Sequence, residues 1–161
     1  MALIIEDGSI VANANSFNTD AELVAYAEAR NATIPDIEAE RDALQIKAID
    51  YLFSKESKMK GCRVDADQEL PYPRRGVCLY GFNIASDAIP KSLKNAQLEA
   101  AIQLVTSELL VNTSVQNVAK EKLGSLEVEY FSGGSWTIQQ SEKIDAYLKE
   151  LLIRPSLMER V

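Results

Sequence analysis

The sequence predicts a mainly α-helical fold, a bundle of about four helices with a small β-hairpin element. Apolar residues recur at the three- and four-residue spacing of amphipathic helices in four segments, whereas only short stretches alternate as strands do. Three of the helical segments open with a capping box or with proline in the first turn. The 161 residues, 47% of them hydrophobic, are enough for one core. We therefore expect one helical domain over residues 1–152 and a C-terminal tail over residues 153–161.

The first two helices have clear start signals. Thr19 and Glu22 have the spacing of a capping box, so a short helix is expected from there to about Asn31. The second helix is expected to open with Pro35 in its first turn, since acidic residues follow near its positive end, and to reach about Ser54.

The middle of the chain is expected to be a loop, a hairpin and the central helix. Residues 55–75 lose the helical spacing and are interpreted as a long connecting loop. Residues 77–80 are expected to pair with residues 82–84 across Gly81. The segment 91–111 then predicts the central helix, about 30 Å long, with Leu104 in one of its buried apolar rows.

The last part predicts a strand pair and a final helix. Residues 126–130 alternate strictly between apolar and polar, as a half-buried strand does, and are expected to turn and return as residues 136–138. Glu127 and Glu129 share one face of that strand. They could hold a divalent cation or act as an acid/base pair, but a solvated strand face is the favoured interpretation. The final helix is expected over residues 141–152.

Several classes of function are excluded by what the sequence lacks. It contains no histidine, which excludes Ser-His-Asp and Cys-His catalysis. Cys62 and Cys78 form no CxxC pair, so we predict two reduced thiols rather than a disulfide framework or a zinc site. There is no phosphate-binding Gly-Lys-Ser/Thr loop, and no apolar run long enough to cross a membrane. We therefore expect a soluble, unexported protein that is not an enzyme, with no catalytic residue, metal or cofactor.

Charge is distributed unevenly along the chain, whose net charge is −7. Residues 1–54 carry three basic and ten acidic side chains, whereas residues 55–75 carry six and four. Cations interleaved with aromatic rings are typical of single-strand binders, and the rings here are Tyr72, Tyr80 and Phe82. The other interpretation, which the near balance of charge in this segment favours, is that the rings cap the core and the cations pair with acidic helices of this subunit or the next. The residues predicted to face DNA or to pair subunits are Lys58, Lys60, Arg63, Arg74 and Arg75.

The C-terminal tail is more apolar than disordered ends usually are. It either folds back on its own domain or docks on another chain, and its composition leaves both open. The residues predicted to meet a partner are Leu151, Ile153, Pro155, Leu157, Met158 and Val161.

Five segments taken in order carry a family resemblance: SFNTDAELVAYAEAR, ALQIKAIDYL, QELPYPRRGV, IPKSLKNAQLEAA and KEKLGSLEVEY. Over residues 3–131 the chain resembles a family of tailed-phage proteins often labelled DnaT-like single-stranded-DNA-binding proteins. Their size and layout are similar to those of head-tail connector adaptors, which form a ring beneath the portal. One departure is that the family usually has Trp-Pro-Arg where this chain has Tyr72-Pro73-Arg74, which favours a packing role for the ring.

The resemblance implies a structural adaptor in the virion neck, made in the cytoplasm of the bacterial host. Its partners would be the phage portal protein and tail-side neck proteins. It would form a homo-oligomeric ring of twelve subunits through which DNA passes without specific binding. The rival interpretation is a single-stranded-DNA-binding replication accessory protein.

Overall fold

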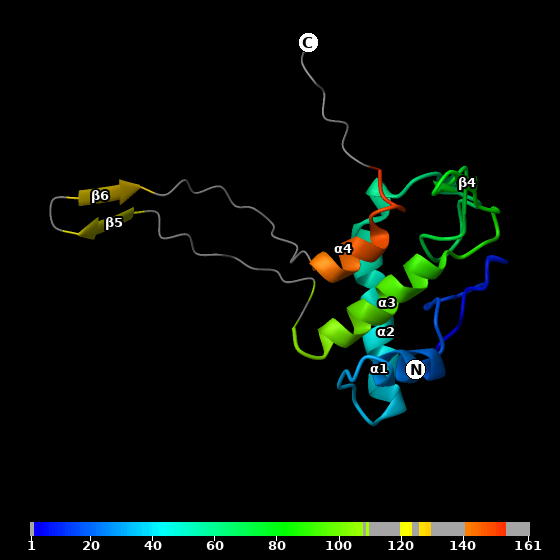
Figure 1. Cartoon of the computed structure of the whole chain (residues 1–161), viewed down its shortest axis with the longest axis horizontal. Coiled ribbons are helices and arrows are strands. Elements are labelled where there is room, and N and C mark those ends of the chain that lie inside the picture. Colours follow the sequence, from blue (N-terminus) through cyan, green and yellow to red (C-terminus); the bar gives the residue numbers. More distant parts are fainter. Residues whose placement is uncertain (1, 108, 110–119, 124–125, 130–140, 154–161) are drawn as a thin grey trace, which may run out of the picture. The chain divides into compact units, whose positions relative to one another are not determined.

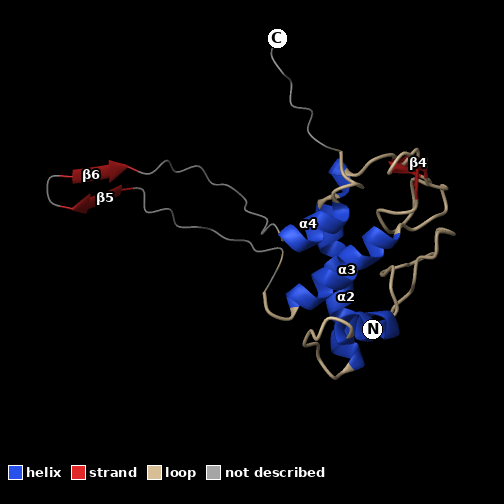
Figure 2. Cartoon of the chain, in the orientation of Figure 1, coloured by secondary structure: helices blue, strands red, loops and turns tan. Residues whose placement is uncertain are grey.

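The computed structural model of the chain describes residues 2–107, 109, 120–123, 126–129 and 141–153. The chain divides into two compact units, residues 1–109 with 140–161, and residues 110–139. In the described part the first unit contains four α-helices and two pairs of short strands, and the second contains one strand pair (Figures 1 and 2). The predicted mainly helical class with small β elements is confirmed. Among the described helices, none has the length and apolar character needed to cross a membrane.

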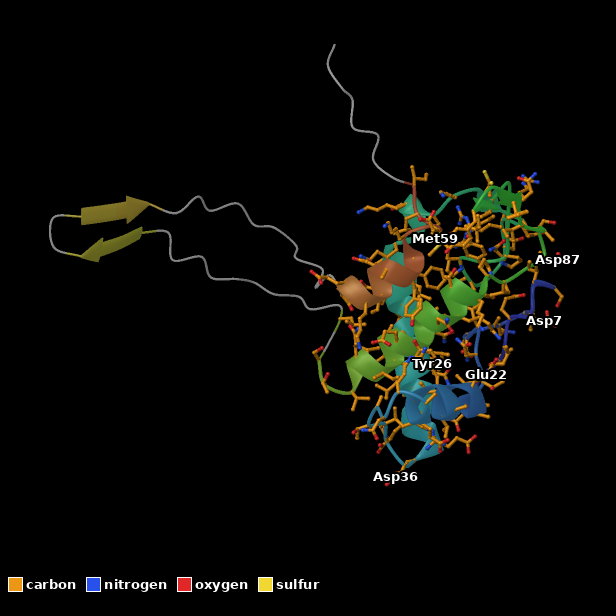
Figure 3. All side chains as sticks on the ribbon, viewed as in Figure 1. Asp7, Glu22, Tyr26, Asp36, Met59 and Asp87 are labelled. Carbon is orange, nitrogen blue, oxygen red and sulfur yellow. The ribbon has the colours of Figure 1, made fainter. Side chains whose placement is uncertain are left out.

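Helix α1 (Asp20–Glu28) begins as predicted. The Thr19 hydroxyl accepts a hydrogen bond from the backbone N–H of Glu22 at 3.2 Å, and the Glu22 carboxylate accepts one from the N–H of Thr19 at 2.7 Å. This reciprocal pair satisfies two donors that a helix start leaves free. The helix buries Leu23, Tyr26 and Ala27; Tyr26 is labelled in Figure 3.

Helix α2 (Glu38–Ser54) ends where predicted but begins three residues after Pro35. The Arg41 guanidinium donates hydrogen bonds to the carbonyl oxygens of Pro35 at 3.1 Å and Asp36 at 2.7 Å. These bonds hold the preceding segment outside the helix, so the predicted start is wrong. Ile37 becomes the N-cap, and its side chain makes no capping hydrogen bond.

Helix α3 (Lys91–Leu104) is the central helix, as predicted, but it ends seven residues before position 111. It contacts α1, α2 and α4 (Glu142–Leu148). Past Leu104 the N–H groups of Val105 and Thr106 bond to carbonyls three residues back, and the Thr106 hydroxyl donates to the Gln103 carbonyl at 3.1 Å. Because such tight turns and side-chain bonds compete with the helical ladder, they terminate it early.

Gln97, a buried residue of α3, connects the N-terminal segment to the helical bundle through hydrogen bonds. The Gln97 carbonyl oxygen accepts hydrogen bonds from the Phe17 N–H at 3.0 Å and from the Asn18 amide at 2.9 Å. Its amide nitrogen donates to the Ser16 hydroxyl at 2.8 Å and to the Gln45 carbonyl at 3.2 Å. Both ends of the side chain are therefore satisfied, as a buried amide requires.

The start of the chain forms a tight loop around Glu6. Its buried carboxylate accepts hydrogen bonds from the backbone N–H groups of Gly8 at 2.8 Å, Ile10 at 3.0 Å and Val11 at 2.9 Å. Gly8 has φ 109°, and a Cβ atom there would lie 1.7 Å from the carbonyl oxygen of Asp87. Figure 3 shows Asp7 and Asp87 on the same side of the molecule. Only glycine allows this close approach.

Residues 55–84 hold more regular structure than the predicted loop. A 3₁₀ turn, η1 (Glu56–Lys58), leads to β1 (Cys62–Arg63), which pairs antiparallel with β2 (Arg74–Arg75). The predicted hairpin is confirmed as β3 (Cys78–Leu79) paired with β4 (Phe82–Asn83), with Leu79 opposite Phe82. Local sequence could not show β1 and β2, because each has two residues and they pair across a ten-residue connection.

The second unit contains β5 (Lys120–Leu123) and β6 (Leu126–Glu129). The predicted strand that starts at residue 126 is confirmed, and it pairs with β5, which precedes it in the chain. The predicted return over residues 136–138 stays a prediction. Residues 136–138 lie outside the described residues. Glu127 pairs in register with Lys122, and Glu129 with Lys120.

The end of the described chain packs against the end of α2. Ser141 caps α4, and the chain then bonds to the 58–60 segment through Lys60 N–H to Leu151 O at 2.8 Å and Ile153 N–H to Lys58 O at 2.7 Å. Leu151 is fully buried in the core of its own chain, whereas Ile153 is 58% exposed. Pro155, Leu157, Met158 and Val161 lie outside the described residues, so the docking tail stays a prediction.

How deeply each leucine of α3 is buried determines how much stability is lost when that leucine is replaced by alanine. Leu93 is fully buried, whereas Leu104, in the last turn, is only partly buried. We expect Leu93→Ala to lower the free energy of unfolding by about 2–5 kcal/mol and Leu104→Ala by less than half as much. Urea denaturation followed by circular dichroism measures both. Equal costs would mean that Leu104 lies in the core, as its apolar row predicted.

Candidate nucleic-acid interface

The LPYPRRG segment is mainly a packing element. Tyr72 is fully buried together with Leu70, Pro71 and Pro73, and the Tyr72–Pro73 peptide bond is cis. Burial raises the pKa of the Tyr72 hydroxyl to about 12, so it stays neutral at physiological pH. The packing role predicted for this ring is confirmed.

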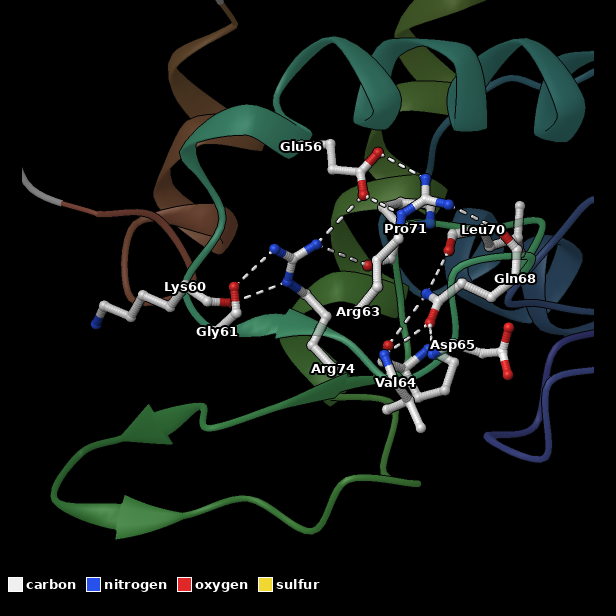
Figure 4. Close-up of polar contacts among 11 residues, drawn as sticks. Glu56, Lys60, Gly61, Arg63, Val64, Asp65, Gln68, Leu70, Pro71 and Arg74 are labelled. Atoms are coloured by element: carbon white, nitrogen blue, oxygen red, sulfur yellow. Dashed lines mark hydrogen bonds and ion pairs between the residues drawn. The ribbon is translucent and has the colours of Figure 1, made fainter.

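Arg74 belongs to this segment, but its side chain is buried rather than exposed to solvent, with 7% of the residue's surface exposed. Its guanidinium donates hydrogen bonds to the carbonyl oxygens of Lys60 at 2.9 Å and Gly61 at 2.8 Å, and it reaches Glu56 at 3.3 Å (Figure 4). Arg63 binds the same carboxylate with two bonds, at 2.7 and 2.9 Å. One acid of η1 thus accepts hydrogen bonds from two arginines on different strands.

The loop between β1 and β2 is organised by a buried amide. The Gln68 carbonyl oxygen accepts hydrogen bonds from the N–H groups of Val64 at 2.9 Å and Asp65 at 3.2 Å. Its amide nitrogen donates to the carbonyl oxygens of Leu70 at 2.7 Å and Pro73 at 3.1 Å (Figure 4). Sequence reasoning missed this residue, because a lone glutamine in a polar loop carries no signal.

Three of the six cations in residues 55–75 form ion pairs within the chain. Arg63 and Arg74 contact Glu56, and the buried Lys55 lies 3.3 Å from Asp145. Among the residues predicted to face DNA or to pair subunits, Lys58 and Arg75 are exposed and Lys60 is partly buried. Arg63 and Arg74 thus pair with an acid of their own chain. The DNA-facing or subunit-pairing role stays a prediction.

Two aromatic side chains project from the tip of the β3–β4 hairpin. Tyr80 is 78% exposed and Phe82 74% exposed, the largest values among the exposed large hydrophobic residues described. The interpretation that all three rings cap the core is correct for Tyr72 and wrong for these two. Val77 and Leu79 are buried, and the N–H of Ile84 donates to the Val77 carbonyl at 2.9 Å. The base of the hairpin is thus anchored while its tip faces solvent.

Tyr80 occupies an unusual backbone position for its size. Its φ is 53° and that of Gly81 is 86°, so both turn residues are left-handed, as in a type I′ hairpin. Asn-Gly is the favoured pair for such a turn, and a bulky residue there costs about 1–2 kcal/mol. Tyrosine improves neither the turn nor the core. What it contributes is an exposed ring at a fixed place.

The chain matches, over residues 1–161, the family described as "Putative DnaT-like ssDNA binding protein". It belongs to this family. Searches of curated proteins and of solved structures find no significant match.

This match corrects the predicted head-tail connector. The family description names single-stranded DNA binding and does not support a virion neck, portal and tail-side partners, a twelve-fold ring or DNA that passes unbound. The shared layout misled the prediction, because a similar size and order of helices does not specify a function. The rival interpretation, single-stranded DNA binding, agrees with the family.

The Glu56 carboxylate should contribute measurably to stability. Hydrogen bonds from Arg63, and then its charge and that of Arg74, hold the pKa of Glu56 below its usual 4.5. Its contribution is therefore present above that value and is lost as the pH falls through the lowered pKa. We expect Glu56→Gln to reduce the free energy of unfolding at neutral pH by about 1–3 kcal/mol.

Urea denaturation at neutral pH and at about pH 3 measures this effect, and the difference from wild type should shrink in acid. Glu69→Gln, which changes an exposed acid of the β1–β2 loop, is the matched control and should be nearly neutral. A difference that does not depend on pH would contradict the assigned role of the Glu56 charge.

Proposed function

We propose that this protein binds single-stranded DNA by stacking bases on Tyr80 and Phe82 at the hairpin tip. The observation that carries the proposal is this pair of exposed rings on an anchored turn, with tyrosine at a φ of 53°. Base–aromatic stacking tolerates any sequence, because every base has a π face. The family description supports the same function.

The geometry favours single strands over duplex. A two-residue turn presents its rings at a narrow tip, and these rings can stack only on bases that are not already stacked and paired. Readout of base edges in a duplex groove needs polar side chains in a row, such as arginine, asparagine or glutamine. The hairpin offers aromatic surface instead, so the expected ligand is unpaired DNA of mixed sequence.

Phosphate contacts have a minor part in this mode of binding. Arg63 and Arg74 contact Glu56, and Lys55 pairs with Asp145. Among the described residues, the cations of the segment without an internal ion pair are therefore Lys58, Lys60 and Arg75. The net charge of −7 opposes long-range attraction of DNA. Stacking must therefore supply most of the affinity.

Substitutions at the tip separate binding from folding. Tyr80→Asn places a favoured residue in the left-handed position and removes the ring, so stability should be unchanged or higher. We expect Tyr80→Asn and Phe82→Ala each to weaken binding of a fluorescein-labelled oligothymidine by about 1–3 kcal/mol, or about 5- to 150-fold in Kd. Fluorescence anisotropy measures the Kd, and Tyr80→Trp should retain binding.

The matched control is Ile153→Ala, which removes an exposed apolar side chain located elsewhere. It should leave the Kd unchanged. If wild type does not bind oligothymidine at low salt, or if both tip variants bind as wild type does, the proposed function is wrong.

Salt dependence tests how the ligand is held. With at most three phosphate contacts from Lys58, Lys60 and Arg75, the slope of log K against log salt should be no steeper than about −2. Anisotropy titrations at several salt concentrations give the slope. A much steeper slope would show that charges, rather than rings, carry the affinity.

A further inference from the structure

Among the three arginines of the described β1–β2 pair, Arg75 alone is exposed. Successive side chains of a strand point to opposite sides. On β2, Arg74 points inward to Glu56, so its neighbour Arg75 points outward. Arg63 of β1 contacts the same acid (Figure 4). No described residue forms an ion pair or a hydrogen bond with the Arg75 guanidinium, which leaves it available to a ligand.

The backbone of Arg75 is held against the base of the hairpin. A Cβ atom on Gly61 would lie 2.4 Å from the Arg75 carbonyl oxygen and 2.8 Å from a side-chain methyl group of Val77. Because only glycine allows this approach, the segment that leads into β1 packs closely on both residues. Val77 is buried, and its carbonyl accepts the hydrogen bond from the Ile84 N–H at the hairpin base. Arg75 therefore has a fixed place beside the hairpin.

The surface between this guanidinium and the two exposed rings is open and carries no negative charge. No atom lies within 4 Å of where a Cβ atom of Gly76 would be. Beyond it, Cys78 and Tyr80 are exposed, while Leu79 between them is buried. Residues 70–86 contain no acidic side chain, in a chain whose net charge is −7. An outward-facing stretch without acids thus runs from the free cation to the rings.

We infer that the ligand is an oligonucleotide whose strand runs along this stretch, from the rings of Tyr80 and Phe82 to Arg75, where the guanidinium binds one phosphate. Guanidinium–phosphate pairs form short, charge-assisted hydrogen bonds that are frequently bidentate. Because the rings hold the bases, this inference rests on the proposed function. It adds the class of ligand, which is a charged strand that reaches both ends of the stretch rather than a nucleotide or a dinucleotide.

The separation of the two ends determines the length of strand required. Five residues lead from Arg75 to Tyr80 and span at most about 17 Å. Successive nucleotides of a stacked strand are about 3.4 Å apart. About five stacked nucleotides therefore cover the stretch, and fewer do so when the strand is extended. A hexamer reaches both ends, whereas a dimer stacked on the rings does not reach the guanidinium.

A combined change of protein and ligand tests the phosphate contact. Fluorescence anisotropy at low salt gives the Kd of a labelled oligothymidine hexamer with phosphodiester linkages and of one with neutral methylphosphonate linkages. We expect Arg75→Gln to weaken binding of the charged hexamer about 5- to 10-fold and to leave the neutral hexamer unchanged. Arg75→Lys, which keeps the charge, should lose less. Tyr80→Asn should weaken both hexamers, because stacking does not need a charged backbone.

Ligand length and a second cation control for general electrostatics. In competition with unlabelled oligomers, Arg75→Gln should weaken the hexamer and not the dimer. Lys91→Gln removes the same charge from an exposed residue in the first turn of α3. It should change the Kd of the charged hexamer less than about twofold, since the contact is local. A melting temperature for each variant establishes that it is folded.

The two free thiols give a second readout in the wild-type chain, which does not depend on how any variant folds. Cys62 lies directly opposite Arg75 in the register of β1 and β2, and both cysteines are exposed. Directly opposite residues share one face of a strand pair. The charged hexamer at saturation should therefore slow alkylation of Cys62 by iodoacetamide, measured by mass spectrometry, without changing the rate for added glutathione.

The outcomes separate this inference from the proposed function. Binding that Tyr80→Asn weakens and Arg75→Gln does not would overturn the inference and leave the proposed function standing. The same would follow if Arg75→Gln weakened the neutral hexamer or the dimer as much as the charged hexamer, or if Lys91→Gln had an equal effect. Unchanged alkylation of Cys62 would place the strand elsewhere. If wild type does not bind the charged hexamer, the proposed function itself is wrong, and the inference with it.

Discussion

The burial of the Arg74 guanidinium is the constraint on which the hairpin region depends. A buried cation needs all of its donors satisfied, and Arg74 meets this need with carbonyl oxygens at residues 60, 61 and 71 and with the Glu56 carboxylate. Three of these partners precede the β1–β2 loop that Gln68 organises, and Pro71 lies within that loop. The single side chain therefore fixes the end of α2 against β2, and β2 in turn leads directly to the hairpin. Val77 and Leu79 then point into the core and the turn residues point out.

Ion pairs within the chain reduce the number of cations in residues 55–75 that are available to contact DNA. In the sequence, six cations beside aromatic rings resemble an electrostatic patch, whereas in the structure three of them make ion pairs within the chain. Any affinity for DNA must come mostly from Tyr80 and Phe82.

Local signals predicted the elements that depend on neighbouring residues. The Thr19 and Glu22 capping box fixed the start of α1, and the glycine between two apolar arms located the β3–β4 hairpin. Features that depend on distant contacts were missed. The pairing of β1 with β2 and the burial of Arg74 each depend on residues that a local pattern does not contain. For the candidate site, sequence identified the aromatic residues but not which of the three rings is exposed, because exposure is decided by packing beneath the turn.

The conformation of the turn bears directly on binding. Gly81 adopts a φ of 86° in open surroundings, since no atom lies within 4 Å of where its Cβ would be. Glycine is therefore favoured at position 81 by its backbone conformation alone. The tight turn that it permits places Tyr80 at the tip of the hairpin. The backbone that carries the ring is already ordered in the free protein, so binding does not have to order the turn, and more of the stacking free energy appears as affinity. The strain at Tyr80 is already present in the free protein, and a bound strand does not have to create it.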